Sequence, residues 1–137
     1  MTAKPLTKRE KSVRRHNLAT LLALLSFVFI AIDSLELVAL PLGVSAIVVL
    51  VLFASIITMF VTRNADEYTA ALWRIGTSAA FVITASFILF LPFFEGMYDG
   101  FMGAHRGQDY DASDMSEVIL MGSFFIANAW ARLRGTV

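Results

Sequence analysis

Four apolar runs divide the chain, and short polar segments separate them. The runs cover residues 18–32, 37–61, 75–94 and 118–131. A helix needs about 20 apolar residues to cross the hydrocarbon core of a bilayer. The second and third runs reach that length, and the first and last are shorter but flanked by residues that continue a helix. The pattern therefore predicts an all-α integral membrane protein with four transmembrane helices, arranged as two hairpins.

The charged residues are unevenly divided between the two sides that four spans create. Ten of the eleven Lys and Arg residues fall on the side that holds both termini, and eight of the eleven acidic residues fall on the other. Because positively charged segments stay in the cytoplasm, we expect both termini to be cytoplasmic. Residues 95–113 then form a long outer loop.

The composition agrees with a membrane protein. Of the 137 residues, 58% are hydrophobic and 16% are charged, and the mean hydropathy is +0.72, whereas soluble domains have about 45–50% apolar and about 25% charged residues. The absence of cysteine excludes disulfides and thiolate metal sites. We expect a basic cytoplasmic tail and helical stub at 1–17, one four-helix membrane domain at 18–134, and a C-terminal tail at 135–137.

Each predicted span is preceded by a capping-box pattern, in which a Thr, Asp or Asn is followed three residues later by Glu. In such a box the two side chains bond backbone amides at the start of a helix. The matches predict helices at 8–32, 34–62, 65–91 and 115–134. The four boxes are Thr7–Glu10, Asp33–Glu36, Asn64–Glu67 and Asp114–Glu117.

Two prolines affect the predicted helix limits. Pro41 falls inside the second helix, and Pro92 lies at the end of the third. Proline lacks an amide hydrogen and clashes with the preceding turn of a helix. We therefore expect Pro92 to end or kink the third helix.

The predicted starts of the first and third helices leave stubs outside the membrane, each roughly 10–15 Å long at 1.5 Å per residue. The first stub is strongly basic, and the second carries two acids in its first turn, where they favour the helix dipole. In one interpretation the acids only start a helix and the basic residues set topology and contact anionic lipid. In the other, the stubs form a docking surface for a soluble protein. The candidate residues of that surface are Arg9, Arg14, Arg15, Asp66, Glu67 and Arg74.

Small residues at helical spacing predict where helices pack. Gly76 and Ala80 lie four residues apart in the third span, and Ser123, Ala127 and Ala131 share this spacing in the fourth. Small side chains let helices approach closely in lipid. These seams join helices either within one subunit or between the subunits of a homo-oligomer, and the sequence leaves both open.

The span cores contain no Asp, Glu, Lys, Arg or His, although ion-coupled transporters and proton relays normally carry such residues at depth. His16 and His105 fall on opposite sides and lack metal-ligand spacing. We therefore expect no enzymatic activity, no cofactor and no metal. Asp109 and Asp111 resemble the start of a calcium loop, but Asp114 stands where that loop needs glycine.

The order of elements resembles that of certain small uncharacterised bacterial four-span membrane proteins, which are often encoded beside helix-turn-helix regulators. The local motif of the resemblance is Asp66-Glu67 at the start of the third span. Tyr68 follows it, where that pattern has a basic residue. The resemblance implies a bacterial inner-membrane protein that holds or controls a soluble DNA-binding partner.

We therefore expect a non-catalytic protein of the cell inner membrane that binds and regulates a soluble cytoplasmic protein, most specifically by sequestering a transcription regulator. Direct binding of nucleic acid is not expected, because the basic tail lies beside a membrane that repels DNA. Two alternatives stay open: an accessory subunit of a larger membrane complex, or a small oligomeric channel or transporter. The expected contacts are membrane lipids, the soluble protein and a second copy of the chain.

Overall fold

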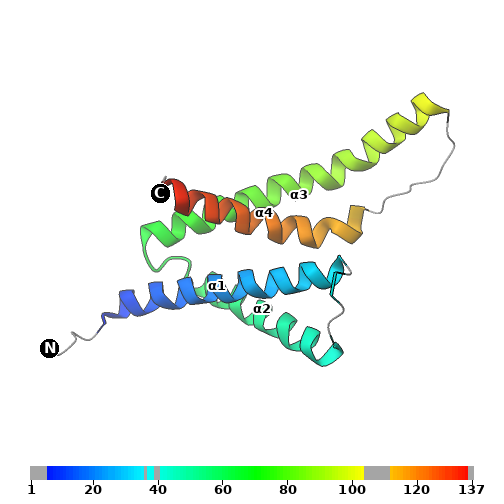
Figure 1. Ribbon diagram of the computed structural model, residues 1–137. Helices are drawn as coiled ribbons and strands as arrows, with labels where there is room; N and C mark the ends of the chain where they lie inside the picture. Colours follow the sequence, from blue (N-terminus) through cyan, green and yellow to red (C-terminus); the bar gives the residue numbers. More distant parts are fainter. Residues whose placement is uncertain (1–5, 36, 39–40, 104–111, 136–137) are drawn as a thin grey trace. The chain divides into compact units, whose positions relative to one another are not determined.

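The computed structural model is all-helical in the part of the chain that it describes (Figure 1). This part comprises residues 6–35, 37–38, 41–103 and 112–135. The prediction of an all-α protein is confirmed. The chain divides into two compact units, Met1–Trp73 and Arg74–Thr136, and each unit is described by itself.

Three of the four helices are long and apolar enough to cross a membrane: α1, α2 and α3. The fourth, α4, carries charges near both ends, which shortens its uncharged stretch. A membrane protein is therefore supported, whereas the fourth span and the side of the termini stay predictions. The helices are α1 (Lys8–Ser34), α2 (Leu42–Thr62), α3 (Glu67–Met102) and α4 (Ala112–Arg134).

In the first unit, α1 begins at the predicted capping box. The Glu10 amide donates to the Thr7 hydroxyl at 3.3 Å, and the Thr7 amide donates to Glu10 Oε2 at 2.7 Å. This reciprocal pair satisfies amides that the first turn leaves without helical partners. The predicted start of the first helix is confirmed.

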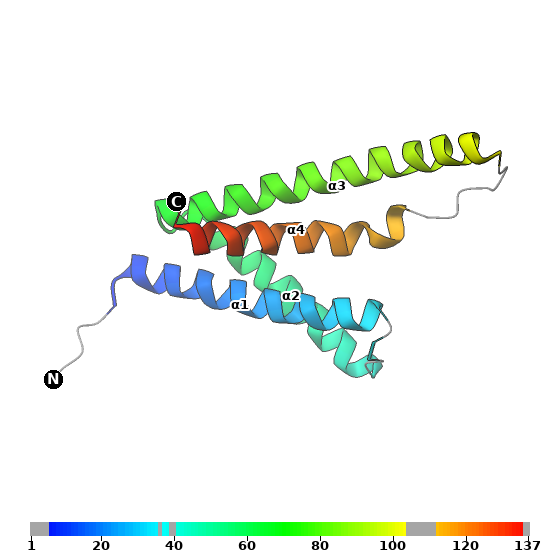
Figure 2. The same ribbon diagram turned by 45° about the horizontal axis from the view of Figure 1, so that its top comes forward.

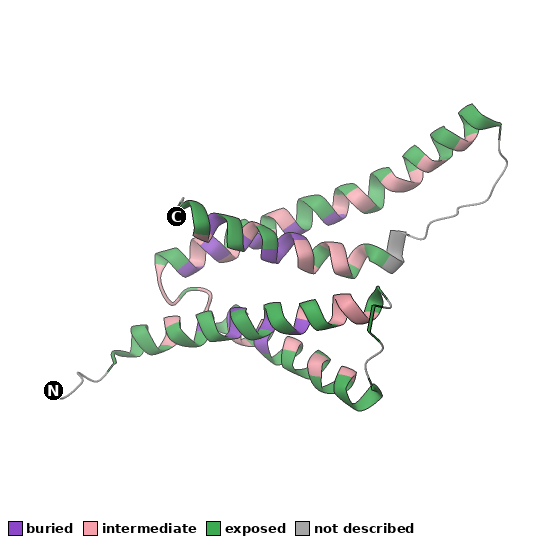
Figure 3. Ribbon diagram, viewed as in Figure 1, coloured by how far each residue is buried: buried purple, intermediate pink, exposed green. Residues whose placement is uncertain are grey.

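The helices α1 and α2 lie side by side and antiparallel, and they bury mainly small and polar side chains (Figures 1 and 3). Large apolar side chains point outward; Leu42, for example, is 88% exposed. This distribution suits helices in lipid, where small residues allow close backbone approach. The buried residues are His16, Ala19, Thr20, Ala23 and Ser26 on α1, and Ser55 and Met59 on α2.

The capping box expected at Asp33 is wrong. Asp33 lies in the last turn of α1, and α2 begins eight residues later than predicted, at Leu42, with Pro41 as its N-cap. The Pro41 carbonyl accepts the amides of Val44 and Ser45 at 2.8 and 3.1 Å. A proline fits the start of a helix because the first amides have no helical acceptor there.

The expected limits of the third helix are also corrected. It begins at Glu67, not at Ala65, and it runs through Pro92 to Met102. Residues 95–102, predicted as outer loop, are therefore helical. A proline inside a helix costs about 3 kcal/mol. Several unsatisfied backbone groups in an apolar environment cost more, so the helix continues.

The start of α4 differs less from its prediction. The helix begins at Ala112, so Asp114 lies inside the first turn and is not the N-cap of a helix that starts at residue 115. The predicted end is confirmed, because α4 finishes at Arg134. Of the predicted outer loop, residues 104–111 lie outside the described part of the chain.

In the second unit, α3 and α4 lie side by side and antiparallel (Figure 2). Gly76 sits against the Phe124 ring so closely that an added Cβ would lie 2.7 Å from Phe124 Cε2. Phe124 in turn packs edge to face on Phe125, with ring centroids 5.3 Å apart. The absence of a side chain at residue 76 therefore permits this contact between α3 and α4.

We expect Gly76→Ala to destabilise the second unit relative to Gly96→Ala. Both glycines are helical, but a Cβ at Gly96 has nothing within 4 Å. Alanine gains up to about 1 kcal/mol of helix propensity at either position, whereas overpacking against Phe124 costs about 1–3 kcal/mol. Thermal unfolding of both variants in the same detergent checks this. Equal stability would mean that the Phe124 ring moves aside without cost.

Candidate functional site

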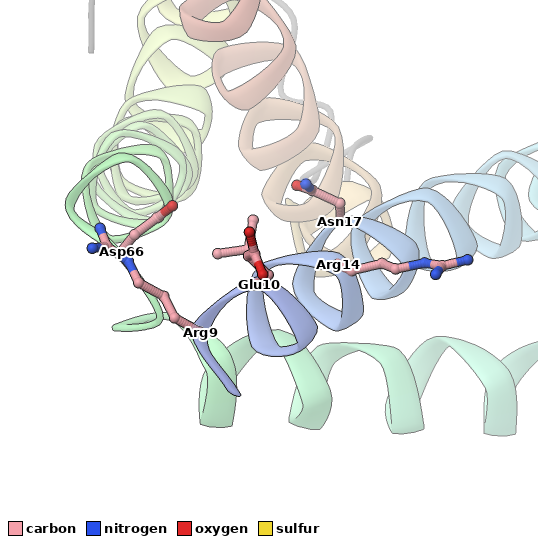
Figure 4. A pocket seen from close by; sticks show the side chains of 6 residues that line it. Arg9, Glu10, Arg14, Asn17 and Asp66 are labelled. Atoms are coloured by element: carbon pink, nitrogen blue, oxygen red, sulfur yellow. The ribbon is translucent and has the colours of Figure 1, made fainter. Parts of the chain in front are cut away.

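An open groove lies beside the first turns of α1 (Figure 4). It has a volume of about 440 Å³ and combines positive, negative, polar and apolar side chains. All of its lining residues belong to the first unit. They are Arg9, Glu10, Val13, Arg14 and Asn17 of α1, and Asp66, which precedes α3.

Helical spacing explains how α1 forms one wall of the groove. Arg9, Val13 and Asn17 follow one another at intervals of four residues, and Glu10 and Arg14 do the same. Residues four apart lie on the same face of a helix. The capping box at Thr7 starts α1 early enough to bring both rows into helical geometry.

Asp66 is held in place by a reciprocal cap at the start of α3. Its Oδ1 accepts the Thr69 amide at 2.7 Å and the Thr69 hydroxyl at 2.6 Å, and the Asp66 amide donates to the Thr69 hydroxyl at 3.1 Å. The cap is therefore two residues further along the chain than the cap predicted at Asn64. A search for Glu or Gln at the third position misses it, because a threonine hydroxyl takes that role here.

The same contacts keep Asp66 ionised. The hydroxyl and the amide of Thr69 lower the pKa of the Asp66 carboxyl, and the charges of Arg9 and His16 lower it further, against a small opposing effect of burial. Hydrogen bonds to a carboxylate favour its charged form. The groove therefore keeps a fixed negative charge at neutral pH.

The arginines of the groove extend in different directions. Figure 4 shows Arg9 reaching across the groove toward Asp66, while Arg14 extends along α1 away from it. Val13 adds an apolar surface, and Asn17 an amide that both donates and accepts. A ligand in this groove would meet donors and acceptors of both signs, so the chemistry favours polar binding.

His16 lies directly beside this wall, in the contact between α1 and α2. Its side chain is fully buried, and its Nδ1 is 3.0 Å from the Thr62 hydroxyl at the end of α2. The Thr62 hydroxyl is in turn 2.6 Å from the Thr58 carbonyl. A hydrogen-bonded chain thus joins the two helices next to the groove.

The structure brings together three of the six predicted partner-binding residues: Arg9, Arg14 and Asp66. Arg15 and Glu67 are exposed but do not line the groove, and Arg74 is an exposed residue of the second unit. The predicted packing residues all lie in the second unit. Four of them are buried, namely Gly76, Ala80, Ser123 and Ala131, and Ala127 is half-buried.

Sequence reasoning missed four residues of this region. Glu10 was assigned only to a cap, and Val13 and Asn17 were not singled out, although their spacing from Arg9 and Arg14 places them on one helix face. His16 was considered only as a metal ligand. Its helical spacing from Ala19, Thr20 and Ala23 places the four residues on one face of α1. This spacing was the signal in the sequence for a buried residue.

Within the described residues, no group of three or more His, Asp and Glu side chains is placed to hold a metal ion. The calcium-like pattern at Asp109 and Asp111, and His105 beside it, lie outside these residues. Comparison of the chain with protein-family models, curated proteins and solved structures gives no match. The resemblance to four-span bacterial proteins therefore stays a hypothesis.

We expect Asp66→Ala to destabilise the start of α3 by about 0.5–2 kcal/mol, the usual effect of removing a helix cap. Asn64→Ala is the matched control, because Asn64 lies in the turn before the observed cap, and it should leave stability nearly unchanged. Amide hydrogen exchange in the first turn of α3 measures both. An equal loss of stability in Asn64→Ala would support the helix cap that the sequence predicted at Asn64.

The cap also gives this part of the structure a defined pH dependence. The pKa of Asp66 is lowered in the folded protein. Its contribution to the stability of the fold is therefore complete at pH values above the ordinary carboxyl pKa. It disappears as the pH falls through the lowered value. The Asp66→Ala variant should lack this dependence.

Proposed function

We propose that the protein spans a bacterial inner membrane four times, with both termini in the cytoplasm. In this proposal it binds a soluble cytoplasmic protein at the groove, and in its most specific form it holds a transcription regulator at the membrane. The observation that carries the proposal is the combination of Arg9, Arg14 and Asp66 in one groove of the first unit. The other observations concern the shape and the surroundings of that groove.

The form of the groove favours a protein over a small molecule. Its volume of about 440 Å³ is within the range of ligand pockets, but such pockets are mostly apolar and enclose their ligand. Here five of the six lining side chains are charged or polar, and the groove is open. Arginine is also enriched among the residues that dominate protein–protein binding.

The two signs of charge define the kind of partner surface that fits. Acidic side chains of the partner would meet Arg9 and Arg14, and a basic or amide side chain would meet Asp66 and Glu10. Such an arrangement fixes the register of a complex and rejects partners of the wrong pattern. The same carboxylates would repel nucleic-acid phosphates, which supports binding of the regulator itself and not of its DNA.

A fourth span is supported by the last turns of α4. The Arg134 guanidinium lies 4.3 Å from the centre of the Trp130 ring, and Arg132 Nε donates to Asn128 Oδ1 at 2.9 Å. Both arginines thus contact the helix one turn before them. Basic and aromatic residues at a span end anchor it at the membrane interface, which compensates for the short apolar run.

The number of spans is tested by reporter fusions at Gly107 and Val137. If α4 crosses the membrane, the two reporters lie on opposite sides, with Val137 in the cytoplasm. If only three helices cross, both reporters lie on the same side. The second result would contradict both the four-span arrangement and the cytoplasmic C-terminus. A fusion at the N-terminus would then show on which side of the membrane the groove lies.

Partner binding is tested by co-purification of the tagged full-length protein from native membranes. Arg14→Glu should abolish recovery of a soluble partner, because it reverses a charge in the groove. Lys11→Glu is the matched control, since Lys11 is exposed on the same helix but does not line the groove, and it should retain the partner. The fusions described above check that neither variant changes topology.

Other outcomes of this experiment contradict the proposal in distinct ways. Equal loss with Lys11→Glu would indicate general charge attraction without a specific site. Recovery of integral membrane subunits in place of a soluble protein would favour an accessory subunit of a larger complex. Recovery of the chain alone, from membranes in which it is abundant, would leave a small channel or transporter as the better interpretation.

A further inference from the structure

An apolar cleft runs along α3 in the second unit, whereas the groove described above belongs to the first. The cleft is open and has a volume of about 520 Å³. Five of its six lining side chains are apolar, so it suits an apolar occupant. The lining residues are Ile83, Ser86, Phe87, Phe90, Leu91 and Phe94.

The apolar stripe that forms the cleft continues to the end of α3. Its members follow one another at intervals of four and three residues in turn, and such positions share a face of a helix. They are Ile83, Phe87, Phe90, Phe94, Met97 and Phe101. Figures 1 and 2 both show the end of α3, which has 36 residues, extending beyond the start of α4, which has 23. Phe101 is accordingly 84% exposed, so α4 leaves this end of the stripe uncovered.

The size of these side chains distinguishes a lipid from a second helix as the occupant. Helices associate in lipid mainly through small residues, because large apolar side chains gain little by leaving the lipid tails. Here the upper end of the cleft is formed by phenylalanine rings. The ring centroids of Phe90 and Phe94 are 6.3 Å apart, and Phe93 packs edge to face on Phe94 at 5.7 Å. Such pairs favour defined ring positions, which give a flexible acyl chain a preformed surface.

The length of the cleft matches one leaflet of a bilayer. From Ile83 to Phe94 the helix rises about 16 Å at 1.5 Å per residue. Half of the hydrocarbon core is about 15 Å thick. Within the predicted third span, 75–94, the cleft occupies the half nearer Met102. An acyl chain of that leaflet therefore matches the cleft from the middle of the bilayer to its edge.

The residues that follow the cleft determine which headgroup fits. Glu95 and Asp99 lie half-buried in the two turns after Phe94. The residues of α3 after Arg74 include no Lys or Arg. Carboxylates attract an ammonium group and repel a headgroup of net negative charge. The charge at this level therefore favours a zwitterionic lipid with an amine over an anionic lipid.

We propose that α3 binds one phospholipid of the leaflet at its Met102 end. An acyl chain of this lipid lies in the cleft, and its amine headgroup lies at the level of Glu95 and Asp99. The bound lipid covers the phenylalanine rings that α4 leaves exposed. The proposal requires only that α3 crosses a membrane, and it is independent of any partner at the groove of the first unit.

Lipid binding is tested by native mass spectrometry of the full-length protein in a mild detergent. The added lipids are phosphatidylethanolamine and phosphatidylglycerol with identical acyl chains. Each chain should retain one phosphatidylethanolamine after the detergent is removed, and it should retain phosphatidylethanolamine in preference to phosphatidylglycerol. Retention of neither lipid, or equal retention of both, would overturn the proposal.

Two serine variants decide whether the cleft holds the lipid. Ser86 is exposed and lines the cleft, so Ser86→Phe should fill it and abolish retention. Ser78 is also an exposed serine of α3 but does not line the cleft, and Ser78→Phe should retain the lipid. Thermal unfolding in the same detergent checks the fold of both variants, and Ser86→Leu is the smaller replacement if Ser86→Phe does not fold. Equal retention by the Ser86 and Ser78 variants would contradict a site in the cleft.

The headgroup is tested separately with Asp99→Asn, which removes one negative charge and leaves the cleft intact. This variant should still retain a lipid but discriminate less between the two headgroups. An unchanged preference would contradict the assigned headgroup position. A dimer of the parent protein that Ser86→Phe dissociates would show that a second copy of the chain occupies the cleft, and it would overturn the proposal.

Discussion

Small and polar side chains at the helix contacts are the constraint on which the rest of this structure depends. In lipid, burying a leucine between helices gains little, because the surrounding tails are equally apolar. The contacts are therefore made where backbones approach closely, as at Ala19 and Ala23 of α1 and at Gly76 of α3. Polar residues placed in such contacts must find partners within the protein. The Ser123 hydroxyl donates to the Ile119 carbonyl at 2.7 Å, and His16 Nδ1 is hydrogen-bonded to the Thr62 hydroxyl of α2.

The helices were predictable from the apolar runs, but their limits depended on local chemistry that a pattern search treats too simply. The apolar runs and capping boxes predicted both limits of α1 to within two residues. They also predicted the last residue of α4, Arg134. Both prolines lie differently from the predicted helix limits: Pro41 precedes a helix that was predicted to contain it, and Pro92, predicted to end or kink the third helix, lies inside a helix that continues to Met102. A proline is tolerated where an amide would have no acceptor anyway. It is also tolerated where leaving the helix would expose several backbone groups to an apolar environment.

About half of the residues that line the groove were predictable. A charged residue in the sequence is a candidate for a binding site, but the sequence does not show in which direction its side chain extends. The sequence identified Arg9, Arg14 and Asp66, and helical spacing alone would have added Val13 and Asn17 to the same face. It did not place Asp66 beside α1, since this position depends on the turn after α2 and on the cap with Thr69. Nor did it identify His16 as a link between helices. That link requires the register of α1 against α2, which sets His16 opposite Thr62.

Both acids of the groove also start a helix, and this double role determines how the groove binds. Lys8, Arg9 and Lys11 open α1 against its dipole, so the cap between Thr7 and Glu10 offsets an unfavourable arrangement of charge. Asp66 likewise holds the start of α3. Each carboxylate is fixed by hydrogen bonds to backbone amides, whereas the exposed arginine side chains keep their rotamer freedom. The acids therefore present fixed positions that set the register of a bound surface, and the arginines adapt to it. Loss of either cap would disturb recognition through position as well as charge, because the helix start and the binding group are the same residue.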